Sequence, residues 1–275
     1  MIIHSFLSAL KIFPFLFLTY LMLEWLERKS SEKSLNLVGK AGKLGTIVGA
    51  FAGLLPQCGF AAAASNFYAV KAISLGTLIA VFLTTSDEML PILISNTVEP
   101  LLIVKILALK LFLGIFFGLL CDVLFRRPSL PVDVETLCEQ EDCHCDGTGI
   151  VKPAFVHSLK ITLFVLLVTL VLNGLLTILG ESFLNDIIFN RPILGPITSA
   201  FVGLVPNCSA SVAITQLYVD GAMSFGSMMA GTLSGAGVGL LVLFRINHNR
   251  NENLKIVTIL YVSAVVSGIL LDFFY

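Results

Sequence analysis

Two short motifs put a side-chain amide next to a thiol, directly after a proline. Residues 55–59 are Leu-Pro-Gln-Cys-Gly and residues 205–209 are Val-Pro-Asn-Cys-Ser, and each motif interrupts an apolar segment. Proline removes a backbone donor and clashes with the preceding turn, so a helix should break at both motifs. Amide oxygens suit Mn²⁺, whereas thiolates suit soft ions and As(III). One break alone would indicate only close helix packing, but two matched breaks predict metal ligands at Gln57, Cys58, Asn207 and Cys208.

Two adjacent carboxylates, Asp87 and Glu88, end a run of hydroxyl residues in an apolar segment. Ionisable residues inside a membrane are costly and are functional candidates by default. Neighbours on a helix point about 100° apart, so one carboxylate would face a pathway while the other pairs or hydrogen-bonds. The matching positions 150 residues later are Gly237 and Val238, so a single negative cluster would serve a cation or a proton. The alternative is that both carboxylates are hydrated near the outer interface, about 10–12 Å from Asn96.

Two lysines interrupt the next apolar stretch. Lys105 lies about 9 Å in from Glu99 at the rise of a helix, a depth close to that of Glu88. We expect Lys105 either to pair with one of the two carboxylates or to extend to the outer headgroups. Lys110 lies deeper. The residues that we expect along the substrate pathway are Ser65, Asn66, Thr84, Thr85, Lys105, Lys110, Ser209, Ser211 and Ser234.

A polar stretch between the two apolar parts of the chain is rich in metal-binding residue types. Residues 138–146 contain three cysteines, one histidine and four carboxylates. These types match soft and borderline metals, although no standard zinc spacing is present. We expect an accessory arm that captures metal through Cys138, Cys143, His144 and Cys145. The alternative is a solvated acidic linker with incidental cysteines.

The elements that must position these residues occur twice in the chain. Gly45–Leu93 aligns with Gly195–Leu243 without gaps, which sets an offset of 150 residues. Two related halves that each carry an interrupted hydrophobic segment at the same place are the sequence sign of a membrane transporter. The residues of the first half that recur are Gly45, Ile47, Ala50, Phe51, Gly53, Leu54, Pro56, Cys58, Tyr68, Ser74, Gly76 and Leu83.

The composition indicates a chain that lies in a lipid bilayer. Of its 275 residues, 56% are hydrophobic and 13% are charged, and the mean hydropathy is +0.94. A soluble domain carries about 25% charged residues, roughly twice this share. The net charge is −1, and no basic stripe for nucleic acid is present. The length suffices for about eight to ten membrane segments of about 20 residues each.

Each half should contain four apolar units, the second of which is broken. Residues 1–25 lack a basic start and a small-residue cleavage site, so we expect a retained helix rather than a signal peptide. The expected units are a helix at 2–25, a broken segment at 40–70, and helices at 72–96 and 99–125. They are followed by a helix at 154–179, a broken segment at 193–218, and helices at 223–244 and 254–275.

The distribution of charge discriminates between two topologies. If each broken segment enters and leaves the membrane on one side, the loops rich in Lys and Arg share a side, as cytoplasmic loops do. If each broken segment were a single span, the basic loop after Phe125 would lie outside. We therefore predict re-entrant hairpins, with both termini outside the cytoplasmic membrane.

With re-entrant hairpins, each half crosses the membrane three times. An odd number of crossings starts the second half on the opposite face, so the repeats are inverted. The predicted fold is an all-α integral membrane protein with two inverted-topology repeats, each with three crossings and a re-entrant or broken helical hairpin. The predicted parts are a first repeat at 1–125, a cytoplasmic Cys/His/acidic loop at 126–152 and a second repeat at 153–275.

The paired breaks and the Thr-Ser-Asp-Glu-Met-Leu-Pro run at residues 85–91 resemble the ten-helix heavy-metal exporter family. Members of that family are labelled arsenic efflux proteins or manganese transporters. The resemblance covers nearly the whole chain and implies an integral inner-membrane permease with an export role. Arsenical permeases of more distant similarity tend to have two close cysteines at the break, whereas each break here has one. The site residues that the resemblance implies are Gln57, Cys58, Asp87, Glu88, Asn207 and Cys208.

These patterns favour a secondary transporter, not an enzyme, that exports a divalent metal, with Mn²⁺ as the first choice. No nucleotide-binding loop is present, so transport would be driven by protons, Na⁺ or the membrane potential. The expected partners are the metal ion and the lipid bilayer. No cofactor is expected, and the sequence leaves open whether the protein forms a homodimer. One alternative is export of a trivalent arsenical through Cys58 and Cys208. Another is a membrane thiol redox protein, which would need these cysteines within about 7 Å between Cα atoms.

Overall fold

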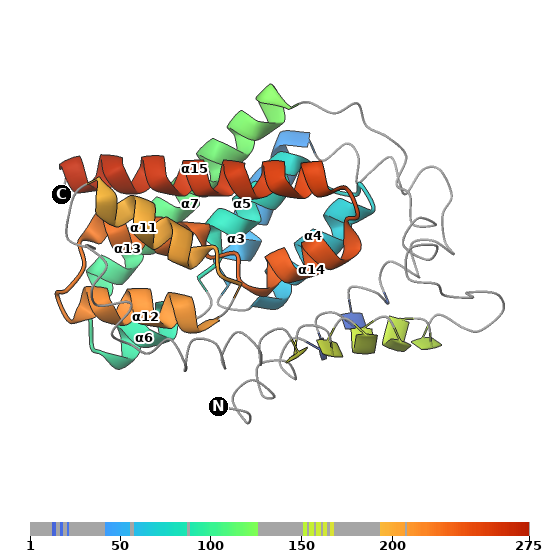
Figure 1. Cartoon of the computed structure of the whole chain (residues 1–275), viewed down its shortest axis with the longest axis horizontal. Helices are drawn as coiled ribbons and strands as arrows, with labels where there is room; N and C mark the ends of the chain where they lie inside the picture. Colours follow the sequence, from blue (N-terminus) through green and yellow to red (C-terminus); the bar gives the residue numbers. More distant parts are fainter. Residues whose placement is uncertain are drawn as a thin grey trace.

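The computed structural model is a helical bundle throughout the part of the chain that it describes (Figure 1). The described residues are 13–14, 17–18, 21, 42–55, 58–86, 89–125, 151–152, 154–156, 158–160, 162–163, 166–167, 193–206 and 208–274. The helices of the first half are α3 (Gly42–Gly53), α4 (Cys58–Ala69), α5 (Leu75–Thr84), α6 (Met89–Ser95) and α7 (Pro100–Leu124). Those of the second half are α11 (Leu194–Gly203), α12 (Cys208–Val219), α13 (Phe225–Ser234), α14 (Val238–Ile246) and α15 (Arg250–Phe274). The expected helices at 2–25 and 154–179 lie largely outside the described residues.

Four helical stretches among the described residues are long and apolar enough to cross a membrane. They are Leu75–Ser95, Pro100–Leu124, Phe225–Ile246 and Arg250–Phe274. The segments that the sequence predicts to be broken form the helix pairs α3–α4 and α11–α12. Each member of these pairs is shorter than the roughly 20 residues that a crossing needs, so the predicted breaks are confirmed.

The duplication extends beyond the segment that aligns in sequence. Helices α4, α5 and α7 recur as α12, α13 and α15, with both ends shifted by 150 residues. Because α15 ends at Phe274, the repeat reaches almost to the end of the chain. Within the described residues, each half therefore contains five helices in the same order.

The central span of each half is itself interrupted. α5 ends at Thr84 and α6 begins at Met89, and α13 ends at Ser234 and α14 begins at Val238, so the spans expected at 72–96 and 223–244 each consist of two helices. In the first half, threonine and serine hydroxyls hydrogen-bond to backbone carbonyls and compete with the helical ladder. In the second half, Gly237 has φ 52°, which glycine adopts without steric cost.

Matched turns start the two central helices. Ser74 and Ser224 cap α5 and α13, and each side-chain oxygen accepts a hydrogen bond from the backbone N–H three residues later. The preceding turns place Lys71 at φ 60° and Gly221 at φ 73°, which closes α4 and α12 with the left-handed residue common at helix ends. The same local chemistry thus sets both turns, although only one uses glycine.

The helix pair α3–α4 begins beside the start of α5, follows α5 to its end and then returns to its start. Thr46 of α3 lies beside Thr77 of α5, and Gly53 at the end of α3 lies against Thr84 at the end of α5. α3 therefore runs parallel to α5, and α4 carries the chain back to Ser74, where α5 begins. The ends of α11 and α13 also lie together, so the second half has the same arrangement.

Glycines bring the long helices α7 and α15 against the central helices in antiparallel orientation. A Cβ on Gly76 of α5 would overlap the carbonyl oxygen of Gly118 in α7. A Cβ on Gly226 of α13 would overlap the carbonyl oxygen of Gly268 in α15. Small residues let helices approach backbone to backbone in a membrane. These four glycines therefore set the spacing of both helix pairs.

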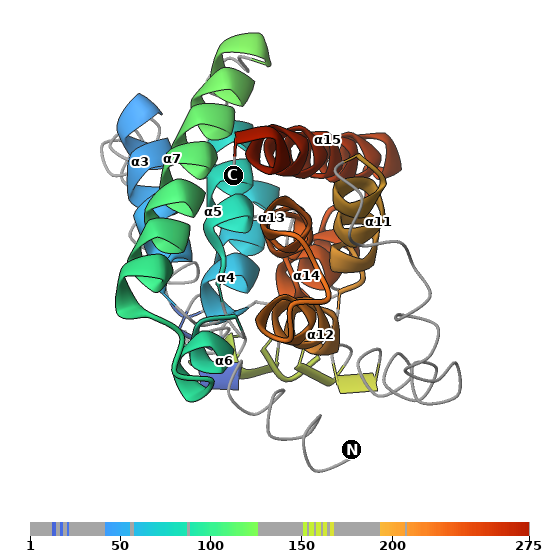
Figure 2. The same ribbon diagram turned by 90° about the vertical axis from the view of Figure 1, so that its left-hand side faces the viewer.

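Each half also packs one helix against the other half. α4 lies beside α14, where Ser65 Oγ donates to the carbonyl oxygen of Gly239 at 2.7 Å. α12 lies beside α6, where Asn96 Nδ2 donates to Gln216 Oε1 at 3.4 Å. Figure 2 shows both pairs from a second side. This reciprocal exchange joins the two halves into one bundle.

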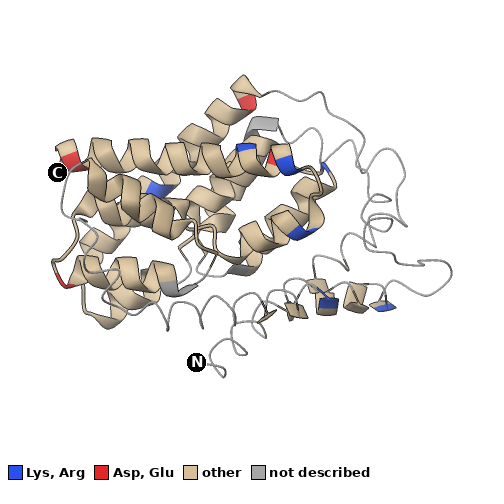
Figure 3. Ribbon diagram, in the orientation of Figure 1, with Lys and Arg blue, Asp and Glu red and all other residues tan. Residues whose placement is uncertain are grey.

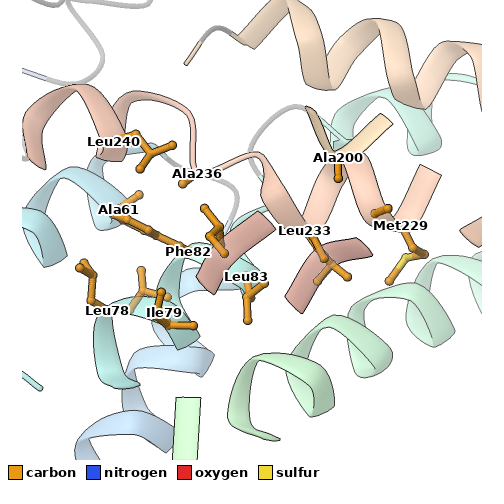
Figure 4. Close-up of a cluster of buried hydrophobic side chains, with 14 of the residues drawn as sticks. Ala61, Leu78, Ile79, Phe82, Leu83, Ala200, Met229, Leu233, Ala236 and Leu240 are labelled. Carbon is orange, nitrogen blue, oxygen red and sulfur yellow. The ribbon is translucent and has the colours of Figure 1, made fainter. Parts of the chain in front are cut away.

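The buried core runs along α5 and α13. Every residue of these two helices is buried, and their apolar side chains pack with those of α4, α11 and α14 (Figure 4). By contrast, α7 and α15 expose large apolar residues such as Phe112, Phe116, Val262 and Phe273. An exposed apolar surface of this kind marks a membrane or protein contact. The broken spans thus form the centre and the unbroken spans cover them.

Candidate functional site

The C-terminal ends of α5 and α13 meet at one buried lysine. Lys110, in the middle of α7, is fully buried. Its Nζ donates to the carbonyl oxygen of Thr85 at 2.5 Å and to that of Thr232 at 3.0 Å. Thr85 caps α5, and Thr232 lies in the last turn of α13. One side chain of the first half thus connects the central breaks of both halves.

The electrostatics of this point favour a cation. The last carbonyls of a helix lack intrahelical donors, and the helix dipole places about half a negative charge there. Two helix ends contribute carbonyls to the same ammonium, which has three donors to satisfy them. A buried ammonium is costly unless its donors are bonded. The arrangement can therefore hold a positive charge between the two halves.

Buried hydroxyls surround the break after α5. Thr84 Oγ1 donates to the carbonyl oxygens of Ala80 at 2.9 Å and Val81 at 3.1 Å, and Thr85 Oγ1 donates to Val81 at 2.8 Å. Ser86 Oγ donates to the carbonyl oxygen of Thr84 at 2.9 Å. Because each hydroxyl hydrogen is directed to the backbone, the oxygen lone pairs remain available as acceptors.

The break after α13 has a simpler lining. Ser234, which occupies the place of Thr84, is buried and donates to the carbonyl oxygen of Ala200 in α11 at 2.8 Å. Ser211 of α12 is half-buried, and its Oγ would lie 3.6 Å from a Cβ on Gly235. The residue that corresponds to Lys110 is Leu260, which is also fully buried. The buried lysine of the first half therefore has an uncharged counterpart in the second.

The structure separates the remaining predicted pathway residues into two environments. Ser65 and Asn66 are buried on α4, where Ser65 bonds to α14 across the interface of the halves. Lys105 is exposed on α7, one and a half turns from the buried Lys110. The predicted pair between Lys105 and a carboxylate stays a prediction, because Asp87 and Glu88 lie outside the described residues.

Most of the predicted metal ligands lie outside the described residues, among them Gln57 and Asn207. Cys58 and Cys208 are the first residues of α4 and α12, and Ser209 follows Cys208; the description of these three residues is limited to the backbone. The accessory arm also lies outside, with Cys138, Cys143, His144 and Cys145. Among the described residues, no cluster of three or more His, Cys, Asp and Glu side chains could hold a metal ion.

Two matched carboxylates were missed by the sequence analysis. Asp122 Oδ1 accepts from the backbone N–H of Gly76 at 2.9 Å, and Asp272 Oδ1 accepts from that of Gly226 at 2.7 Å. The second oxygen of Asp122 accepts from Thr46 Oγ1 at 2.6 Å. Asp122 and Asp272 are 150 residues apart, so extending the alignment past residue 93 would have found them. The sequence analysis also missed Thr232, because its contact with Lys110 is made by a main-chain carbonyl, which every residue type has.

Broken, buried central helices inside a layer of lipid-length apolar spans define a multi-pass membrane protein of the transporter class. The chain belongs to a family described as "Putative, 10TM heavy-metal exporter", whose model matches residues 4–183 and 148–275. The family agrees with the resemblance predicted from the paired breaks, and it implies a heavy-metal substrate and a transport role. No curated protein and no solved structure matches the chain.

Proposed function

We propose that this protein is a secondary-active transporter that exports a divalent heavy metal, preferably Mn²⁺, through a site between its two halves. The observation that carries the proposal is the convergence of two helix ends, one from each half, on the buried ammonium of Lys110. Secondary transporters bind ions where broken helices expose carbonyls and helix ends inside the membrane. The family adds the heavy-metal substrate.

The helix directions support inverted repeats. α14 runs alongside α4 in the same direction. Gly239 at the start of α14 lies against Ala61 and Ser65, and Tyr68 near the end of α4 contacts Glu252, which follows α14 at the start of α15. α4 leads back to the start of α5, and α14 continues the span of α13. On this reading, α5 and α13 approach Lys110 from opposite faces of the membrane. Each of the pairs α3–α4 and α11–α12 is then a re-entrant hairpin.

The charges support an orientation with both termini outside the inner membrane. Lys255 Nζ lies 3.6 Å from the centroid of the Phe125 ring, so the loop after α7 leaves from the end where α15 begins. The Lys and Arg residues at that end lie toward one side of the bundle (Figure 3), whereas Glu99 and Asp220 lie at the turns of the other end. The basic residues are Lys71, Arg245, Arg250 and Lys255. Because cytoplasmic loops are rich in Lys and Arg, the Cys/His/acidic loop at 126–152 is cytoplasmic and could deliver metal.

The proposed metal shell combines charge with neutral oxygen. Asp87 and Glu88 supply the negative charge, and the amides of Gln57 and Asn207 supply oxygens from the two hairpin breaks. Carboxylate and carbonyl oxygens suit Mn²⁺. Coupling to protons, Na⁺ or the membrane potential drives export, and rocking of one half against the other exposes the site alternately.

The test is metal uptake into inverted membrane vesicles that contain the protein, with Mn²⁺, Zn²⁺, Cd²⁺ and arsenite compared. We expect Mn²⁺ to accumulate, and we expect Asp87→Asn to reduce the rate by at least tenfold, about 1.4 kcal/mol in the barrier. Glu99→Gln is the matched control, since Glu99 is exposed and its side chain makes no cap hydrogen bond. Wild-type rates in Asp87→Asn would contradict the carboxylate site.

A trivalent arsenical is the second candidate substrate. The observation that favours it is that Cys58 and Cys208 each begin a helix at the matched break, the first of α4 and the first of α12. Thiolates bind As(III). In the same vesicles, arsenite uptake that survives Asp87→Asn but is lost in Cys58→Ser or Cys208→Ser would replace Mn²⁺ by the arsenical.

A further inference from the structure

Lys110 is a buried, charged side chain that meets main-chain acceptors of both halves. Its Nζ bonds to Thr85 of the first half and Thr232 of the second, at 2.5 and 3.0 Å. The lysine belongs to α7, whose other contacts hold it firmly against α5: Gly114 and Gly118 approach α5 through Thr84 and Gly76. The long side chain therefore reaches across to α13 from a fixed base.

Two of the acceptors that hold this ammonium, the carbonyl oxygens of Thr85 and Thr232, are of the kind that an ion would use. Both are carbonyls near the C-terminal end of a helix, where partial negative charge accumulates. Both also sit next to an interruption of a buried span, a position at which secondary transporters coordinate cations. The lysine thus fills a cation position between the halves with a charge that is tethered to the protein.

Only one half carries this charge. The matched position in α15 is Leu260, which is buried in the core. If Lys110 had only a structural role that both halves share, we would expect the same residue type at both positions. Asp122 and Asp272 are such a pair, since they make the same contact in the two halves. The asymmetry is instead that of a single charge that serves one central site.

We propose that the Lys110 ammonium takes the place of the substrate cation in the empty transporter and is displaced when the metal ion binds. The inference rests on the proposed function, because it assumes a cation substrate at the central breaks. Two positive charges at one buried point repel strongly. The metal ion and the ammonium therefore exclude each other, and the side chain leaves the carbonyls of Thr85 and Thr232 as the metal arrives.

Because the ammonium replaces the metal ion at the central breaks, the empty transporter keeps a positive charge there. With the ammonium in position, the ends of α5 and α13 remain joined while the halves rock back without metal. Net export requires this return step, whereas exchange of metal for metal across the membrane uses only the loaded protein. Removal of the Lys110 charge should therefore slow net transport and spare exchange.

The experiment compares both modes in proteoliposomes with radioactive Mn²⁺. In Lys110→Gln, we expect net Mn²⁺ efflux to fall by about tenfold or more, Mn²⁺–Mn²⁺ exchange to continue at a rate close to wild type, and Mn²⁺ to bind about tenfold more tightly. Lys110→Arg keeps the charge and should retain net efflux in part. Arg250→Gln is the control, since it removes one positive charge at an exposed position at the start of α15, outside the predicted pathway.

Two results would overturn the inference while leaving the proposed function intact. The first is a wild-type rate of net efflux in Lys110→Gln, which would show that the empty protein returns without the ammonium. The second is equal loss of exchange and net efflux, which would assign Lys110 to substrate binding or to the fold. By contrast, a wild-type protein that moves Mn²⁺ in neither mode contradicts the proposed function itself.

Discussion

At the scale of single residues, the same carboxylate contact is built twice. Asp122 and Asp272 each accept a backbone N–H from the first turn of a central helix, at Gly76 and Gly226. A carboxylate at a helix N-terminus satisfies a donor that lacks an intrahelical partner and complements the helix dipole. Each aspartate also accepts from a hydroxyl, which fixes the rotation of the carboxylate. These contacts anchor the outer ends of α5 and α13, so that their inner ends meet at Lys110.

We expect Asp122→Ala and Asp272→Ala to destabilise the protein to a similar extent. Each change removes hydrogen bonds to a charged group, worth about 1.5–3 kcal/mol. The measurement is the melting temperature of the purified protein in detergent. Asp220→Ala is the control, because Asp220 is exposed in the turn before α13. Melting temperatures that match this control would show that the carboxylates do not anchor the helices.

At the scale of helices, the breaks are positioned by close packing beside them. Gly114 of α7 faces the end of α5, where a Cβ would overlap Thr84 Cγ2 and lie 3.2 Å from the carbonyl oxygen of Ala80. Gly203 of α11 faces the end of α13 in the same way. Because packed helices cannot deform continuously, the spacing at these glycines determines where the carbonyls beyond them lie.

We expect Gly114→Val to separate α5 from α7 and to weaken the contact between Lys110 and Thr85. Overpacking of this kind costs about 1–3 kcal/mol, which should lower both the melting temperature and the rate of net Mn²⁺ efflux. Ala108→Val is the matched control, since Ala108 is exposed on the same helix and the added methyl groups face lipid. Equal behaviour of the two variants would mean that the approach of α5 and α7 is not limiting.

At the scale of the whole molecule, the two halves are interlocked rather than merely adjacent. α4 packs against α14 and α12 against α6, and the Tyr68 hydroxyl donates to the Glu252 carboxylate at the start of α15. Any rocking between the halves must therefore disturb these contacts.

The proposed topology predicts opposite locations for the central loop and the C-terminus. Phe125 lies beside Lys255 near the start of α15, whereas the chain ends beyond the other end of that 25-residue helix. In inverted vesicles, we expect protease to remove an epitope tag inserted in the loop at 126–152 and to spare a tag after Tyr275. Removal of both tags would contradict the topology with re-entrant hairpins.

The amino-acid sequence by itself determined the features that depend on local composition. Mean hydropathy indicates a membrane protein, prolines at matched places predict the breaks at 55–59 and 205–209, and the offset of 150 residues predicts two equivalent halves. The all-helical fold and the family agree with these predictions. These signals come from composition, from the positions of single residue types and from the comparison of two stretches of the chain, and none of them depends on a tertiary contact.

Only the tertiary structure decided which parts of the two halves meet. The breaks at 85–88 and 235–237 lie in segments whose hydropathy is that of continuous spans, so composition could not reveal them. Lys110 was a candidate from its depth, but its contact with Thr232 joins positions 122 residues apart through a main-chain carbonyl. Every residue type carries such a carbonyl. The carbonyl of Thr232 differs from the others because it lies at the end of α13, and the packing of the helices brings that end to Lys110.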